Sequence, residues 1–251
     1  MLNIIVPLAG RGSRFADAGF TDPKPLIAFG GRPMIQWVID NIRPARAHRF
    51  IFVCLAGHLE RYPAIRTQLT GLCPGCAIVT VAEVTQGAAC TVLLARDFID
   101  NDEPLMIANS DQLVDLPVDG YLAHGDASAT DGCIMTFWAD HPKWSYCRIR
   151  LDGTVSEVVE KQVVSNHATV GIYNFARGRD FVAAADAMIS RALRVNGEFY
   201  VAPVYNLMIE RGARIIVVPA GREGDGMHGL GTPEDLRRFL RSDAFRRLAR
   251  G

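Results

Sequence analysis

The sequence has no excess of charge of either sign, no long apolar run and no flexible linker. Its 251 residues include 27 basic and 27 acidic side chains, so no overall field attracts the chain to nucleic acid. No stretch approaches the roughly 18 consecutive apolar residues that a membrane span requires. The N-terminal run Leu2–Leu8 is short and has no basic segment before it, which favours a first strand over a signal peptide. We therefore expect a cytoplasmic protein with neither nucleic-acid nor membrane partners.

Cysteines are also too scattered to indicate a metal or disulfide framework. The sequence has six, and only Cys73 and Cys76 stand close together. No second pair follows at the spacing of a zinc site. We interpret these two as free thiols in a turn before a strand, in a reducing compartment.

Strand-like runs alternate with helical patterns through the first half of the chain. The expected strands are Asn3–Leu8, Phe50–Leu55, Ala77–Ala82 and Pro104–Ala108, and the expected helices lie near Met34–Ile42, Leu59–Leu69 and Ala88–Phe98. The strands are almost continuously apolar, which is typical of a parallel sheet with helices on both faces.

Beyond about residue 130, strands follow one another with turn residues between them. The expected strands are Gly132–Trp138, Tyr146–Leu151, Thr154–Val159, Thr169–Phe175 and Arg214–Val218, with helices near Gly178–Ala192 and Val201–Arg211. This order favours an antiparallel or mixed extension of the sheet. Thr232 and Pro233 have the pattern of an N-cap and first residue of a last helix. We expect one domain, 1–251, made of two halves, 1–130 and 131–251.

The segment PLAGRGSRF, Pro7–Phe15, directly follows the first expected strand. Gly10 and Gly12 allow positive φ and a close approach of the backbone, so that successive N–H groups can bind phosphate. Ligands of open α/β sheets bind beyond the carboxyl ends of the strands, where this loop lies. It is neither a P-loop nor a dinucleotide fingerprint, because the glycine spacings differ and no helix is expected to open at once.

Two cations follow these glycines. Arg14 lies two residues after Gly12, and Lys24 stands between Pro23 and Pro25. Prolines on both sides restrict the backbone of the lysine and are expected to hold it extended, which suits a fixed contact to a phosphate.

The run Ala9–Arg14 followed by Lys24-Pro25 resembles the signature of the sugar nucleotidyltransferases, or nucleotide-sugar pyrophosphorylases. Later segments resemble that family in the same order, namely Thr85–Ala89, Asn109–Asp111, Val158–Lys161 with Val170–Tyr173, Asn196–Tyr200 and Gly229–Asp235. The resemblance implies a Rossmann-like α/β fold of GT-A-like architecture, with a mixed, mostly parallel sheet flanked by helices.

The resemblance also implies that 1–130 is a nucleotide-binding half and 131–251 an acceptor-binding half, with a group of binding residues for each. The nucleotide would be held by Leu8, Ala9, Gly10, Arg11, Gly12, Ser13, Arg14, Lys24, Gln86, Gly87 and Asn109, and the acceptor by Glu160, Lys161, Gly171 and Glu198. Four of the site residues would be catalytic. Arg14 would bind the β- and γ-phosphates and Lys24 the α-phosphate, while Asp111 would bind Mg²⁺. Lys161 would bind the phosphate of the acceptor.

One position departs from the family pattern. There, a second aspartate completes the magnesium site two positions before the glycine of the C-terminal Gly-Thr motif, and here Gly229 stands at that position. Asp225 and His228 are nearby, although neither is at the matching place. Either the ion has one protein carboxylate plus phosphates and waters, which Mg²⁺ tolerates, or the metal site is altered.

The implied activity is a Mg²⁺-dependent condensation of an NTP with a sugar 1-phosphate or a similar phosphorylated metabolite, releasing pyrophosphate. A glycosyltransferase of related fold should carry an Asp-x-Asp motif and would not need Lys24, so we disfavour it. A non-catalytic protein that binds a nucleotide or nucleotide sugar remains an alternative because of Gly229.

The sequence leaves open which base and which acceptor are bound and whether the protein forms a homo-oligomer. The arginines between Arg237 and Arg250 are expected to form a solvated face or a subunit contact.

Overall fold

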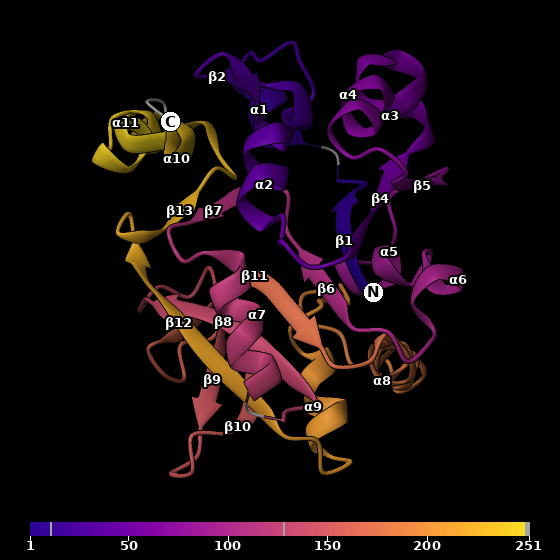
Figure 1. The fold of residues 1–251 in the computed structure, drawn as a ribbon, viewed down its shortest axis with the longest axis vertical. Coiled ribbons are helices and arrows are strands. Elements are labelled where there is room, and N and C mark those ends of the chain that lie inside the picture. The colour runs from indigo at the N-terminus through magenta and orange to yellow at the C-terminus, as the bar shows by residue number, and fades with distance from the viewer. Residues whose placement is uncertain (11, 128, 249–251) are drawn as a thin grey trace.

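The computed structural model describes residues 1–10, 12–127 and 129–248 (Figure 1). One mixed sheet of eleven strands runs through these residues. Its main path, in spatial order, is β5 (Ala77–Val81), β4 (His48–Leu55), β1 (Leu2–Leu8), β6 (Leu105–Ala108), β11 (His167–Phe175), β8 (Gly132–Trp138), β12 (Ile215–Glu223), β13 (Gly226–Gly229) and β7 (Gln112–Val114). Off this path, β9 (Ser145–Ile149) pairs with β11 and β10 (Val155–Glu160), and β2 (Ala28–Phe29) forms a separate pair with β3 (Arg32–Pro33).

The direction of the strands changes where the second half of the chain begins. β1 is parallel to β4 and β6, and β4 is parallel to β5. β11 is antiparallel to both β6 and β8, whereas β12 is again parallel to β8. The predicted mixed, mostly parallel sheet is therefore confirmed, and one reversed strand joins its two parts.

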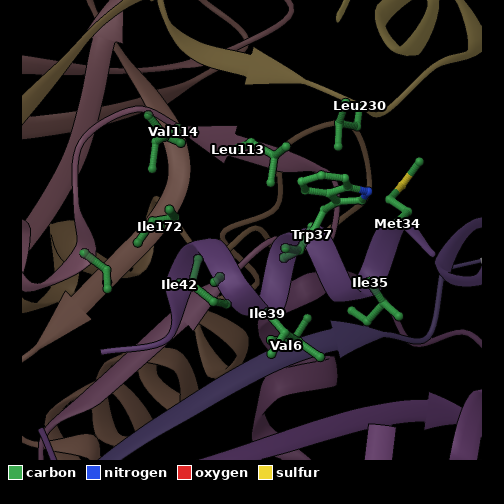
Figure 2. Packing of buried hydrophobic residues seen from close by; sticks show 14 of the residues in the cluster. Val6, Met34, Ile35, Trp37, Ile39, Ile42, Leu113, Val114, Ile172 and Leu230 are labelled. Carbon is green, nitrogen blue, oxygen red and sulfur yellow. The ribbon is translucent and has the colours of Figure 1, made fainter. Parts of the chain in front are cut away.

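Helices cover both faces of this sheet (Figure 1). In chain order they are α1 (Ser13–Asp17), α2 (Met34–Ile42), α3 (Ala56–Arg61), α4 (Ala64–Leu72), α5 (Ala88–Leu93), α6 (Arg96–Ile99), α7 (Val118–Ala127), α8 (Gly178–Ser190), α9 (Val204–Ile209), α10 (Pro233–Leu240) and α11 (Asp243–Leu248), with a 3-10 turn at Lys24–Leu26. Successive residues of a strand point to opposite faces, so Ile4 and Val6 pack in one core cluster with α2 and α7, and Ile5 in another with α5, α8 and α9. Figure 2 shows Ile35 and Ile39 of α2 beside Val6.

Two of the expected helices are interrupted, so the prediction of a single helix was wrong in both places. α3 and α4 replace the expected Leu59–Leu69, because Pro63 has no N–H with which to continue the hydrogen bonds of α3. α5 and α6 replace the expected Ala88–Phe98. α7 was not predicted at all, since Gly120 and Gly125 weaken its helical pattern.

The C-terminal segment confirms the expected start of the last long helix. The Oγ1 of Thr232 accepts a hydrogen bond from the backbone N–H of Asp235 at 3.1 Å, and a proline is the first residue of α10. Arg238 and Arg246 pair with neighbouring carboxylates on the surface, and Arg250 lies outside the described residues. Within the described part of the chain, every helix is too short or too polar to cross a bilayer.

Candidate active site

The predicted nucleotide-binding residues follow three strands of the sheet. The glycine loop follows β1, Gln86 and Gly87 follow β5, and Asn109 and Asp111 follow β6. β5, β4, β1 and β6 are neighbours and run parallel, so their carboxyl ends share one edge. The structure thus gathers segments from distant parts of the sequence at the edge where open α/β sheets bind ligands.

The glycine loop packs against the predicted catalytic lysine. Gly12 has φ +65°, in the left-handed region that favours glycine. A Cβ added to Gly12 would lie 3.6 Å from the Cβ of Lys24. α1 begins directly after Gly12, so the expectation that no helix opens there was wrong. Arg11, predicted to bind the nucleotide, lies outside the described residues.

The other described residues of the glycine loop differ in their exposure to solvent. Leu8 and Ala9 are buried, whereas Gly10, Ser13 and Arg14 are exposed. The buried pair joins the loop to the core. The exposed residues, with a guanidinium among them, are open to an anionic ligand.

Lys24 and Asp111 form an ion pair at the centre of this edge. The Nζ of Lys24 donates to Oδ2 of Asp111 at 2.5 Å, and the side chains are 19% and 24% exposed. The lysine begins a 3-10 turn, so the expected extended backbone was wrong; a proline fits the first turn of a helix, where its missing N–H has no role. The carbonyl of Asp111 accepts from the backbone N–H of Leu230 at 2.7 Å, which ties this edge to the C-terminal Gly-Thr segment.

The position that lacks the family's second aspartate faces another carboxylate. A Cβ added to Gly229 would lie 3.8 Å from the Cγ of Asp235. Asp235 accepts hydrogen bonds from Thr232 and Arg238. In the described ranges, no three His, Cys, Asp or Glu side chains come together as a metal site. A metal at this edge would therefore depend on Asp111 and on oxygen atoms of the ligand.

His228 and Asp225, the two residues considered as substitutes for that aspartate, lie elsewhere in the structure. The Nε2 of His228 lies 3.0 Å from Oδ1 of Asp115, and the histidine is buried beside α10. Asp225 lies in the turn between β12 and β13, where its carbonyl accepts from the backbone N–H of Arg222 at 2.6 Å. That turn is at the opposite end of β13 from Gly229.

Glu160 ends β10 and lies opposite Ser145 of β9. The hydroxyl of Ser145 donates to the Glu160 carboxylate. Burial raises the pKa of Glu160, and the hydrogen bond from Ser145 and the charge of Lys161 oppose that rise. A carboxylate with one hydroxyl partner keeps lone pairs for the hydroxyl groups of a ligand.

Lys161 has an unusual backbone and a defined side-chain partner. Its φ is +56°, which is uncommon for a residue with a side chain and often marks a functional site. Its Nζ donates to the hydroxyl of Tyr200 at 2.6 Å, and this hydrogen bond raises the pKa of Lys161. Glu160 and Glu198 add to the rise by their charge. The structure thus brings Glu160 and Glu198, two further predicted acceptor residues, close to the Lys161 ammonium.

Gly171 connects the acceptor residues to the nucleotide residues. Its φ is +97°, and an added Cβ would lie 2.2 Å from Nδ2 of Asn109 and 2.5 Å from Oε1 of Gln112. The backbone N–H of Asn109 donates to the carbonyl of Gly171 at 2.9 Å. Any larger residue at 171 would displace both amides, so the site requires glycine here.

The segment after β5 is held against a segment from the second half of the chain. The N–H of Phe199 donates to the carbonyl of Gln86 at 2.9 Å, and its carbonyl accepts from Ala89 at 3.0 Å. Gly87 has φ +133°, and an added Cβ would lie 2.4 Å from the carbonyl oxygen of Phe199. The side chain of Gln86 accepts from Arg194 at 2.5 Å.

Sequence reasoning missed several residues that the structure places here. Gln112 is adjacent to the predicted Asp111, and Tyr200 lies in a segment already matched to the family, so a nearby motif could have pointed to both. No motif lies next to Ser145 or Arg194, because cross-strand pairing and a turn in the second half bring these two residues to the site.

A model described as nucleotidyl transferase matches residues 4–192 of the sequence. The chain belongs to this family. The match extends from the glycine loop through Lys24 and Asp111 to Lys161 and Gly171, so the resemblance seen in the sequence is confirmed.

Relatives and solved structures agree with this membership. The catalytic subunit beta of mannose-1-phosphate guanylyltransferase from Danio rerio is 28% identical over 184 residues, covering 70% of this chain and 50% of that protein. The chain spans about half the length of the curated relatives it matches first. A nucleoside-diphosphate-sugar pyrophosphorylase from Vibrio cholerae RC9 has a TM-score of 0.82 at 25% identity, covering 95% of this chain and 100% of that one. A UDP-glucose pyrophosphorylase complexed with UDP-glucose, at 18% identity and a TM-score of 0.75, shares the fold over 99% of each chain.

Proposed function

We propose that the protein is a cytoplasmic nucleotidyltransferase that joins an NTP to a sugar 1-phosphate or a similar phosphorylated metabolite, giving an NDP-sugar-type product and pyrophosphate. The observation that carries the proposal is the ion pair of Lys24 and Asp111 beside the glycine loop. It sets a cation suited to a phosphate next to a carboxylate suited to a metal, at the edge where such sheets bind nucleotides. Family membership supports the same reaction type.

The reaction requires positioning and charge neutralisation more than covalent help from the protein. A phosphate oxygen of the acceptor attacks the α-phosphorus of the NTP. The bond from the α-phosphorus to the bridging oxygen of the β-phosphate breaks, and pyrophosphate leaves with that electron pair. The attacking oxygen is already ionised, so no general base is needed.

Cations of the first half would hold the triphosphate. Lys24 would leave Asp111 and contact the α-phosphate, where charge develops during transfer. Exposed Arg14 and the N–H groups of the glycine loop would bind the β- and γ-phosphates. The packing of Gly12 against Lys24 fixes these two contacts relative to one another.

Asp111 fits Mg²⁺ as the one protein carboxylate of its site. Its carboxylate already binds a cation, the Lys24 ammonium, and it is 24% exposed. Mg²⁺ commonly keeps several waters and is bound by one or two carboxylates together with substrate phosphates. When bound, the ion would offset part of the negative charge of the triphosphate.

Residues of the second half would hold the acceptor. Lys161 would bind its phosphate, and Glu160 and Glu198 its hydroxyl groups. The left-handed backbone of Lys161 and the hydrogen bond to Tyr200 keep the ammonium in a defined place. Because Gly171 has no Cβ, the amides of Asn109 and Gln112 pack directly against it, and the two substrates would meet near this contact.

A panel assay tests the proposal. The purified protein is incubated with each of CTP, ATP, UTP and GTP, with Mg²⁺ and with a series of sugar 1-phosphates, and pyrophosphate is measured. We expect pyrophosphate with at least one pairing, and none when either substrate is left out. If no pairing releases pyrophosphate while the protein retains a nucleotide sugar, a glycosyltransferase or a non-catalytic binding protein replaces this proposal.

A further inference from the structure

Three buried hydroxyl groups lead from the core of the second half to the carboxylate of Glu160. They belong to Thr169 and Tyr173 of β11 and to Ser145 of β9. The hydroxyls of Thr169 and Tyr173 lie 3.0 Å apart, and that of Ser145 donates to Oε2 of Glu160. Burial raises the pKa of Tyr173, and hydrogen bonds with Thr169 and Ser145 oppose that rise. The four side chains therefore form one continuous row of hydrogen bonds.

A bulge in β11 brings the first two hydroxyls together. In a regular strand, residues four positions apart are separated by about 13 Å. The register of β11 with β8 shifts between Thr169 and Tyr173, and Gly171, which lies between them, has φ +97°. Such bulges bend a strand and change the direction of its side chains. The bend at Gly171 thus serves this row as well as the packing against Asn109.

The hydroxyl protons of the row point toward Glu160. An ionised carboxylate only accepts hydrogen bonds, so Ser145 donates its single O–H proton to it. Ser145 can then only accept from Tyr173, and Tyr173 can only accept from Thr169. Hydrogen bonds in such a chain polarise one another in a buried setting, and they favour the ionised form of the carboxylate that receives them.

Other groups around Glu160 act on its pKa in both directions. Burial raises this pKa, the hydrogen bond from Ser145 and the charge of Lys161 lower it, and the charge of Glu198 raises it again. Glu160 is only partly buried, and among the described residues none donates a hydrogen bond to its Oε1. That oxygen is therefore open to a donor on a ligand, while Oε2 is held by the row.

We propose that Ser145 and Tyr173 are positioning residues for the acceptor, which hold the Glu160 carboxylate ionised and in one orientation, with Oε1 left for a hydroxyl group of the acceptor. Neither residue has to touch the acceptor for this role. A core that needed only apolar packing would be served by phenylalanine at 173, because a buried hydroxyl costs free energy unless it is hydrogen-bonded. This inference rests on the proposed function, and it adds two residues to those predicted for the acceptor.

Tyr173→Phe tests the row with the smallest change, because it removes the hydroxyl and keeps the ring. We expect the KM for the phosphorylated acceptor to rise about 5-fold, as for one lost hydrogen bond, while kcat and the KM for the NTP stay within about 2-fold. The pKa of Glu160 is followed by carbon-13 NMR of the carboxyl groups, with Glu160→Gln for assignment. It should rise by about 0.5 or more, because the ionised form loses support.

Ser145→Ala shows whether Tyr173 acts through Ser145. It should raise the KM for the acceptor about 10-fold, and adding Tyr173→Phe to it should change that KM by less than about 2-fold further. Tyr205→Phe is the matched control, because its hydroxyl lies in the same core cluster as Tyr173 and donates to the carbonyl of Asn174 at 2.8 Å. It should leave the KM for the acceptor and the pKa of Glu160 at their wild-type values.

The outcomes distinguish this inference from the function on which it rests. If Tyr173→Phe leaves the pKa of Glu160 unchanged, or if it adds its full effect to that of Ser145→Ala, the inference is wrong even where pyrophosphate is released. If the wild type releases no pyrophosphate with any pairing, the proposed function fails, and the role in acceptor binding falls with it whatever the pKa of Glu160.

Discussion

At the scale of single residues, Lys161 combines a backbone conformation that lysine rarely adopts with one strong partner, Tyr200. We predict that Lys161→Ala raises the KM for the sugar phosphate by about 30-fold, the range expected for a lost charged hydrogen bond, while the affinity for the NTP changes by less than about 2-fold. Steady-state kinetics with each substrate varied in turn measures the split. Arg148→Ala, which breaks an exposed ion pair with Glu157, is the control. Equal losses for both substrates would contradict the assigned division between the two halves.

The environment of Glu160 leads to a prediction about how stability depends on pH. Burial raises its pKa above the ordinary value of 4.5, so the folded protein binds a proton there that the unfolded chain has already released. The stability that this proton contributes is therefore present at low pH and is lost as pH rises through the folded pKa.

Unfolding by denaturant at several pH values tests this sign. Between pH values below 4.5 and neutrality, the free energy of unfolding of the wild type should fall relative to that of Glu160→Gln. Glu157→Gln, exposed on the same strand, serves as the control and should follow the wild type. A wild type that gains stability over Glu160→Gln as pH rises would show that the carboxylate is not stabilised in its protonated form.

At the scale of elements, the sequence predicts buried strands better than surface helices. Gly132–Trp138 is found with the predicted bounds, and most other strands within two residues, because strands buried on both faces are continuously apolar. β7 and β13 were missed because they are short and pair with one another from distant positions. The helix predictions were wrong at Pro63, which separates two helices, and at α7, which forms although its glycines weaken the helical pattern.

In the candidate site, too, some residues could be predicted from the sequence and others could not. The glycine loop and Asp111 follow β1 and β6, which are parallel neighbours in the sheet, so their common edge could be predicted from strand order. Arg194 could not, since only the turn at 195–198 turns it back to Gln86. Contacts that depend on folding of the second half onto the first have no local signal.

The cap of α10 gives a prediction at this scale. Thr232 accepts from the backbone N–H of Asp235, and the segment just before it bonds to the carbonyl of Asp111. We expect Thr232→Ala to lower the free energy of unfolding by about 1 kcal/mol, as for other N-caps, measured by urea denaturation. Thr70→Ala, at an exposed interior position of α4, should cost less. Equal effects would mean that the cap does not stabilise α10.

At the scale of the whole molecule, strands of the two expected halves belong to one sheet. The central pairing of β6 with β11 joins them, and the contacts of Asn109 with Gly171 and of Gln86 with Phe199 continue this junction to the ligand edge. The division at residue 130 stays a prediction. In the proposed reaction, each half would supply one lysine, Lys24 or Lys161, to one of the two anionic substrates.

The rate of pyrophosphate release by Lys24→Met tests this account most directly. With the best NTP and sugar phosphate found for the wild type, we predict a rate at least about 100-fold lower, because the cation that stabilises the transferring phosphate is removed. Arg96→Met, which breaks an exposed ion pair with Asp186, should keep the wild-type rate. A Lys24→Met variant that releases pyrophosphate within about 2-fold of the wild-type rate would contradict a nucleotidyl-transfer site built around Lys24 and Asp111.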